Sequence, residues 1–141
     1  MPSFLLVDDN PLVCSVLKFL VKEKFSRCQV DEPENLQAAL EKIRKKNYSL
    51  VMIDVHVTDA DAIELANSLL EVRRDVKILM YGISHTTSLA HKYLELGIMG
   101  CLAKDEEEDE IQKAIESVLN NGKYISPKLF YGLTGEYSAK F

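Results

Sequence analysis

The 141-residue sequence contains no tryptophan, only three cysteines, four prolines and six glycines. The cysteines, Cys14, Cys28 and Cys101, are isolated and odd in number, so they indicate neither a disulfide framework nor a CxxC metal or redox site. The low glycine and proline content, together with 47% hydrophobic residues, excludes a disordered or fibrous chain. We expect one domain with one core.

Long apolar runs are also missing. No segment approaches the roughly 20 apolar residues that a membrane span requires, and the N-terminus lacks the pattern of a signal peptide. We therefore expect a cytoplasmic protein that does not contact a membrane. The formal net charge is −5, so this domain's own surface is not expected to bind nucleic acid.

Short apolar segments alternate with amphipathic segments along the chain, a pattern typical of a parallel sheet covered by helices on both faces. The segments expected to be strands are Phe4–Val7, Cys28–Val30, Leu50–Ile53, Val76–Tyr81 and Gly100–Ala103. This alternation predicts an α/β fold with a doubly wound five-stranded parallel sheet, in the common order 2-1-3-4-5. Ligands of such sheets bind outside the carboxyl ends of the strands.

Helix start and stop signals separate the strands. The expected helices are 11–24 after the N-cap Asn10, one opened by Pro33, 61–72, 86–96 with Gly97 as its stop, and a fifth ending at Asn121–Gly122. The acidic run 105–110 is interpreted as a solvated helix N-terminus rather than a cation site. We expect residues 1–122 to form the domain and 123–141 to be a tail or truncated linker.

Carboxylates follow two strands that the predicted order places side by side: Asp8 and Asp9 follow the first, and Asp54 follows the third. Considered alone, the Asp8–Asp9 pair is equally compatible with helix capping. Three carboxylates at one edge would repel each other unless a cation were present. Mg²⁺ suits such a site, because it takes one or two carboxylates, waters and a phosphate oxygen. A carboxylate can itself attack phosphorus to give an aspartyl phosphate.

Lys104 follows the fifth predicted strand and is therefore expected at the same edge. Its ammonium group would pair with Asp54 and then with a phosphoryl oxygen. The alternative is an ordinary surface lysine.

The stretches Leu5–Pro11, Leu50–Asp54 and Gly97–Lys104 resemble the signature segments of response-regulator receivers, in family order and spacing. The likeness covers about residues 1 to 122, and it implies a flavodoxin-like (βα)5 fold. It is strongest to receivers that precede a helix-turn-helix DNA-binding domain, which implies a role in transcription regulation.

The resemblance also assigns roles to residues. It implies that Asp54 is the phosphoacceptor, that Asp8 and Asp9 organise Mg²⁺, and that His56 lends its backbone carbonyl to the metal. The phosphoryl group would come from a histidine kinase or a phosphotransfer protein. Such a domain is not an enzyme beyond its own phosphorylation and dephosphorylation. It would signal, and could form a homodimer, through the face made by the fourth helix, fifth strand and fifth helix.

Two positions depart from the family pattern. Receivers usually carry Thr or Ser where this chain has Gly82, and an aromatic residue where it has Cys101. Ser84 lies two residues after Gly82 and is a weaker candidate for the missing hydroxyl. Two hypotheses therefore stay open: a phosphorylated signalling domain, or a degenerate receiver that acts independently of phosphorylation as an interaction or dimerisation module.

Overall fold

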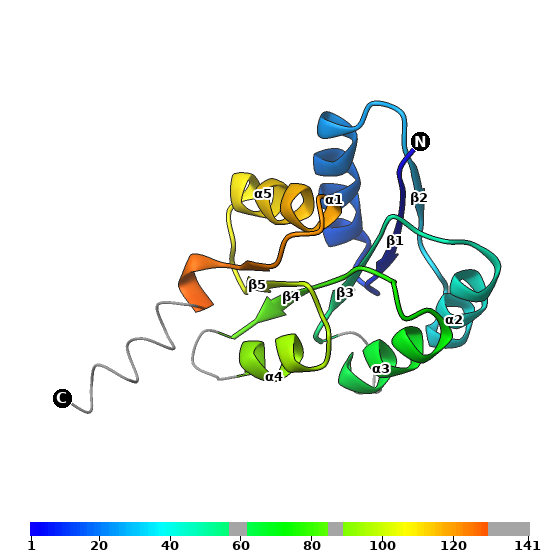
Figure 1. Ribbon diagram of the computed structural model, residues 1–141. Helices are drawn as coiled ribbons and strands as arrows, with labels where there is room; N and C mark the ends of the chain where they lie inside the picture. Colours follow the sequence, from blue (N-terminus) through cyan, green and yellow to red (C-terminus); the bar gives the residue numbers. More distant parts are fainter. Residues whose placement is uncertain (57–61, 85–88, 130–141) are drawn as a thin grey trace.

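The computed structural model describes residues 1–56, 62–84 and 89–129, and over these residues it forms one parallel sheet between two layers of helices (Figure 1). The strands are β1 (Ser3–Val7), β2 (Gln29–Asp31), β3 (Leu50–Asp54), β4 (Ile78–Ile83), β5 (Gly100–Ala103) and β6 (Tyr124–Ile125). Their order is β2-β1-β3-β4-β5-β6. The predicted fold and the order of the first five strands are confirmed, and β6 extends the sheet beside β5.

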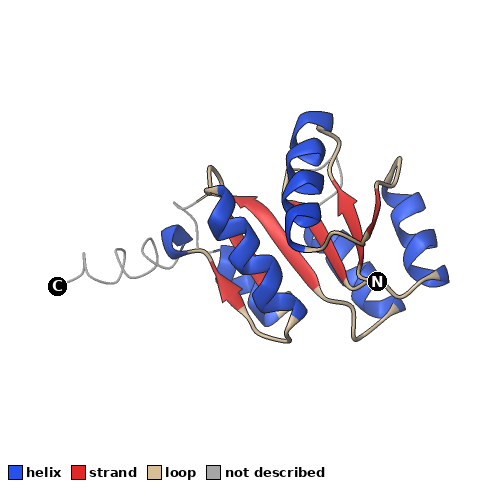
Figure 2. Ribbon diagram, turned by 90° about the horizontal axis from the view of Figure 1, so that it is seen from above, coloured by secondary structure: helices blue, strands red, loops and turns tan. Residues whose placement is uncertain are grey.

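The described helices are α1 (Pro11–Lys24), α2 (Leu36–Lys45), α3 (Ala62–Val72), α4 (Leu89–Glu95) and α5 (Glu108–Leu119). Helices α1 and α5 cover one face of the sheet, whereas α2, α3 and α4 cover the other (Figures 1 and 2). None of these helices is long and apolar enough to cross a membrane.

Helix boundaries follow the capping residues. The Asn10 side chain accepts hydrogen bonds from the backbone N–H groups of Leu12 and Val13, and Pro11 is the first helical residue, as predicted. The second helix begins at Leu36 rather than at Pro33. The reason is local, because the Asn35 side chain accepts the backbone N–H of Ala38 and so acts as the N-cap.

The helix ends also bear out the sequence signals. Gly97 follows α4 with φ +100, and Asn121 follows α5 with φ +66, both in the left-handed region where glycine and asparagine are favoured. The predicted first residues of the third and fourth helices, Asp61 and Thr86, lie outside the described residues.

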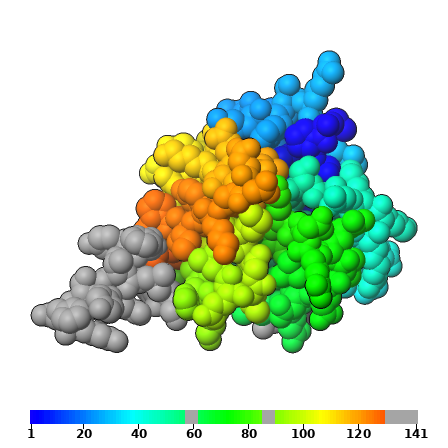
Figure 3. Space-filling view, in the orientation of Figure 1, coloured from blue at the N-terminus to red at the C-terminus, as the bar shows by residue number. Residues whose placement is uncertain are grey.

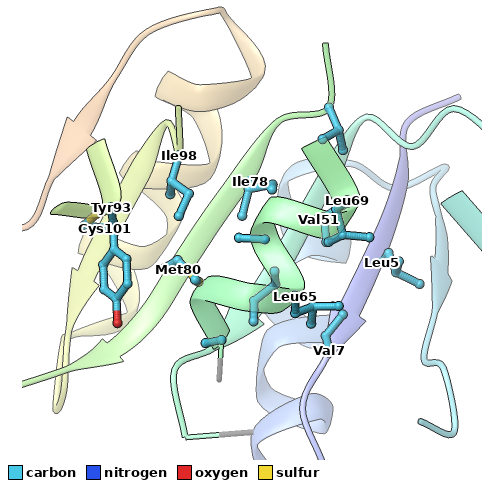
Figure 4. Close-up of a cluster of buried hydrophobic side chains, with 14 of the residues drawn as sticks. Leu5, Val7, Val51, Leu65, Leu69, Ile78, Met80, Tyr93, Ile98 and Cys101 are labelled. Carbon is cyan, nitrogen blue, oxygen red and sulfur yellow. The ribbon is translucent and has the colours of Figure 1, made fainter. Parts of the chain in front are cut away.

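The core has two parts because successive strand residues point to opposite faces of the sheet. Phe4 and Leu6 pack toward α1 and α5, whereas Leu5 and Val7 belong to the cluster under α2, α3 and α4 (Figure 4). Residues Phe4–Val7 of β1 are buried and apolar on both faces, as expected for a strand inside a parallel sheet. This buried sheet holds the strand ends in fixed positions.

The segment after α5 packs against the sheet, where the sequence indicated a linker. Strand β6 pairs with β5, and Ser126 and Leu129 are buried. The Ser126 hydroxyl donates a hydrogen bond to Glu106, whose side chain is only 5% exposed. In the space-filling view this segment, in orange, lies against α5, in yellow (Figure 3). A two-residue strand is too short to show a period-2 pattern, and the end of the domain stays a prediction.

Candidate functional site

The acidic residues predicted to converge lie at the carboxyl ends of two neighbouring strands. Strands β1 and β3 are paired in parallel, with Val7 opposite Ile53. Asp8 and Asp9 follow β1 directly, and Asp54 is the last residue of β3. The register therefore brings Asp8 and Asp54 to the same edge of the sheet. We call Asp8, Asp9 and Asp54 the acidic corner.

Asp54 is half-buried at this edge. Burial raises the pKa of its carboxyl group, and the negative charges of Asp8 and Asp9 raise it further. A hydrogen bond from the backbone N–H of His56 to Asp54 Oδ1, at 3.0 Å, opposes part of this rise. The ionised carboxylate is therefore destabilised relative to a solvent-exposed aspartate, and a nearby positive charge would relieve it.

Asp8 makes two hydrogen bonds through different carboxylate oxygens. Its Oδ1 accepts the backbone N–H of Asn10 at 2.8 Å, and its Oδ2 accepts the hydroxyl of Tyr81 at 2.7 Å. Burial, followed by the bond to Asp8, raises the pKa of the Tyr81 hydroxyl above its usual range, so Tyr81 stays a neutral donor.

Sequence reasoning did not identify Tyr81 as part of the site. One signal was available, since Tyr81 precedes Gly82 at the end of a strand next to β3. The register places it opposite Asp54. Its side chain nevertheless reaches Asp8, because phenol rings are long enough to span from one strand end to another.

At Gly82 the backbone itself approaches Asp54. Gly82 has φ +80, and a Cβ atom built there would lie 2.8 Å from Asp54 Oδ1. The register between β4 and β5 shifts between Met80 and Ile83, so β4 carries a bulge at this point. The backbone conformation and the close approach thus both favour glycine here.

The ring of His56 also contacts the bulge. His56 Nε2 lies 3.1 Å from the carbonyl oxygen of Gly82, a hydrogen bond that the Nε2–H tautomer donates. Ser84, the second candidate at this position, is half-buried and follows Ile83, the last residue of β4. Its predicted role as a substitute hydroxyl stays a prediction.

Cys101 occupies a packed position on β5. It is fully buried beside Tyr93 of α4, and its Sγ lies 3.9 Å from the carbonyl oxygen of Ala90 (Figure 4). Burial raises the pKa of this thiol to about 12, which makes it unreactive at neutral pH. The position is therefore filled by a small residue with an aromatic ring supplied from α4.

Lys104 lies at the expected edge. Its backbone N–H donates to the Ile83 carbonyl at 2.7 Å, which joins the ends of β4 and β5. The Lys104 side chain is exposed, and none of the ion pairs within the described residues joins it to Asp54. The structure therefore places Lys104 at the correct edge without the predicted pairing.

The acidic corner is suited to a hard cation but is not a closed metal cage. Within 1–56, 62–84 and 89–129, no three His, Cys, Asp or Glu side chains are grouped as a ready-made metal site. Mg²⁺ does not need such a group, because it binds through one or two carboxylates and keeps several waters. The oxygen donors and the raised pKa of Asp54 fit this ion.

The fold and the acidic corner together define a doubly wound α/β domain with carboxylates at its switch point, and known proteins share this arrangement. A family profile, the response regulator receiver domain, matches residues 4–116. The chain is 35% identical over 138 residues to the transcriptional regulatory protein MctR of Rhizobium johnstonii, covering 94% of this chain and 62% of MctR. The chain belongs to the response regulator receiver domain family.

Further similarities agree with this assignment. DegU of Brevibacillus brevis, also a transcriptional regulatory protein, is 26% identical over 135 residues, which cover 96% of this chain and 57% of DegU. A LuxR-family two-component response regulator from Aurantimonas sp. SI85-9A1 has the same fold, with a TM-score of 0.87 and 23% identity over 96% of this chain and 97% of that one. The chain spans about half the length of the curated relatives it matches.

Proposed function

We propose that this domain accepts a phosphoryl group on Asp54 and works as the receiver of a two-component system. The observation that carries the proposal is the placement of Asp54: half-buried, beside Asp8 and Asp9, at the carboxyl edge of the sheet. Three acids at one edge reduce stability, and such a cost is typical of a functional site.

In the proposed reaction a carboxylate oxygen of Asp54 attacks the phosphorus of the donor, which is a phosphohistidine or a small acyl phosphate. A P–O bond to Asp54 forms while the bond from phosphorus to the donor breaks, and its electron pair leaves with the imidazole or carboxylate. Bound Mg²⁺ would neutralise charge on the phosphoryl oxygens.

The proposed roles of the other residues follow from their positions at this edge. Asp8 and Asp9 would hold Mg²⁺ with Asp54 and with the backbone carbonyl of His56. Lys104 is exposed at the end of β5, so its ammonium group is free to turn toward a phosphoryl oxygen on Asp54.

The partners and output are likewise proposed from the family. A histidine kinase or phosphotransfer protein would supply the phosphoryl group. MctR and DegU carry the name of transcriptional regulatory proteins, and the match covers 62% of MctR and 57% of DegU. We therefore propose regulation of transcription as the output, through the α4-β5-α5 face, and a small change at that face because Gly82 and Cys101 replace the usual switch residues.

A second candidate function is an interaction module that is independent of phosphorylation. It is favoured by two observations: Tyr81 donates a hydrogen bond to Asp8, and β5 has Cys101 but no aromatic residue that could move. Light scattering with and without acetyl phosphate separates the two functions. A phosphorylation-dependent change of oligomeric state excludes the independent module.

Incubation with acetyl phosphate and Mg²⁺, followed by intact-mass measurement, tests the main proposal. We expect one phosphoryl adduct that Asp54→Asn abolishes and EDTA prevents. Asp31→Asn is the matched control, since Asp31 is an aspartate at the end of β2 and should leave the adduct intact. Absence of an adduct with several donors and with either Mg²⁺ or Mn²⁺ would contradict the proposal.

A further inference from the structure

Tyr81 links the acidic corner to a cavity between α1 and α5. Its hydroxyl donates to Asp8 Oδ2 at 2.7 Å. Its ring forms part of the wall of a mostly apolar cavity of about 340 Å³, which is also lined by Leu12, Leu102 and Ile111. The phosphoryl chemistry proposed above assigns no role to Tyr81. Its contact with one of the proposed metal ligands therefore needs its own explanation.

The hydrogen bond from Tyr81 occupies one of the carboxylate lone pairs with which Asp8 could bind a cation. A carboxylate has about four lone-pair positions, of which Asn10 N–H and the Tyr81 hydroxyl occupy one on each oxygen. Hydrogen bonds to an ionised acceptor are about twice as strong as neutral ones. A cation at Asp8 would draw on the same negative charge, so the two interactions oppose each other.

Tyr81 stands between the core and the cavity. It packs against the core cluster that contains Phe4 and Leu6, and it also lines the cavity. Gly82, the next residue, carries a positive φ at the bulge of β4, so the backbone beside Tyr81 is irregular as well.

Building on the function proposed above, we propose that the Tyr81 hydroxyl is an internal competitor of the divalent cation at Asp8. It stabilises the Asp8 carboxylate when no cation is bound and sets the cation concentration at which the site fills. Removal of the hydroxyl alone should therefore increase the affinity for the cation. Tyr81 is a positioning residue in this scheme, because it acts through Asp8.

Mn²⁺ titration followed by the electron paramagnetic resonance signal of free Mn²⁺ measures this affinity directly. Tyr81→Phe keeps the ring and should bind Mn²⁺ about tenfold more tightly, the size expected when one charge-assisted hydrogen bond stops competing. Tyr48→Phe is the matched control. It removes another buried tyrosine–aspartate hydrogen bond, between Tyr48 and Asp31, and should leave the affinity unchanged.

An Asp8→Asn background separates competition from a general loosening of the fold. There the Tyr81→Phe gain should disappear, because the carboxylate for which the hydroxyl competes is gone. Tyr81→Met, an unbranched apolar side chain, is the second variant if Tyr81→Phe unfolds, and it should change the affinity in the same direction. Circular dichroism in EDTA checks folding of each variant.

Equal or weaker Mn²⁺ binding by folded Tyr81→Phe, or no binding by any variant, would overturn the competition. Failure of the phosphoacceptor proposal gives a different result. In that case acetyl phosphate leaves no adduct, while the Tyr81→Phe gain in Mn²⁺ affinity persists.

Discussion

The two halves of the carboxyl edge differ in what they do for the fold. The β1–β3 half gathers Asp8, Asp9 and Asp54. Burial raises the pKa of Asp54, and the negative charges of Asp8 and Asp9 raise it further. The β4–β5 half contains a backbone bulge at Gly82 and the fully buried Cys101. The clustered carboxylates make the β1–β3 half less stable. The β4–β5 half is instead shaped by close packing and by its backbone conformation. Substitutions should therefore stabilise the fold in the β1–β3 half and destabilise it in the β4–β5 half.

The largest effect is expected when an aromatic residue is placed on β5. Cys101→Tyr would insert a ring into a fully buried position next to the Ala90 carbonyl group, and overpacking of this kind costs about 1 to 3 kcal/mol, occasionally more. Urea denaturation should show this loss of unfolding free energy. Cys28→Tyr, at a partly exposed cysteine, is the matched control and should cost less. Equal losses would show that Cys101 is not tightly packed.

A smaller loss is expected when a hydroxyl is restored at the bulge. Gly82→Ser places a Cβ in the left-handed region and against Asp54 Oδ1, which should cost about 1 to 2 kcal/mol. Thermal unfolding measures the loss. Gly97→Ser is the control: φ is also positive there, but the nearest atom to an added Cβ is 3.9 Å away. If Gly82→Ser were no more destabilising than Gly97→Ser, the close approach to Asp54 would be wrong.

In the acidic corner we expect a substitution to increase the stability of the fold, by less than the losses predicted for β4 and β5. The folded pKa of Asp54 is raised above its unfolded value, so folding favours the protonated form. The stability from this preference is present below the unfolded pKa and is lost as the pH rises through the folded pKa. Asp54→Asn should therefore raise the melting temperature at pH 7 in EDTA.

The same substitution should have a reduced effect in acid. Below the unfolded pKa, Asp54 is protonated in both the folded and the unfolded protein. The increase in melting temperature caused by Asp54→Asn should therefore be smaller. Calorimetry at pH 7 and near pH 3 checks this. A gain that is equal at both pH values would mean that the repulsion in the acidic corner does not set the effect.

The sheet and the acidic corner could be predicted from the sequence because their signals are local. An apolar run followed by a carboxylate places Asp8 and Asp54 at strand ends, and the doubly wound order makes those ends neighbours. Asn10 and Pro11 likewise mark the first helix. The chemistry of Asp8 and Asp54 at this edge stays a prediction.

The missed features depend on contacts between distant segments. The bond from Tyr81 to Asp8 spans 73 positions, and its geometry depends on the bulge in β4. The burial of Glu106 depends on Ser126, which lies in a segment without any periodic pattern. The sequence showed that Gly82 lacks a hydroxyl group, but only the structure shows that a Cβ added there would lie against the Asp54 carboxylate.

The most direct test of the central claim compares backbone amide spectra of the ¹⁵N-labelled protein before and after addition of acetyl phosphate and Mg²⁺. We expect large chemical-shift changes at Asp54, His56 and Gly82, and smaller changes at Tyr93 and Cys101. Equally large changes across α4 and β5 would contradict the proposed small change at the α4-β5-α5 face. No change at Asp54 would contradict the site itself.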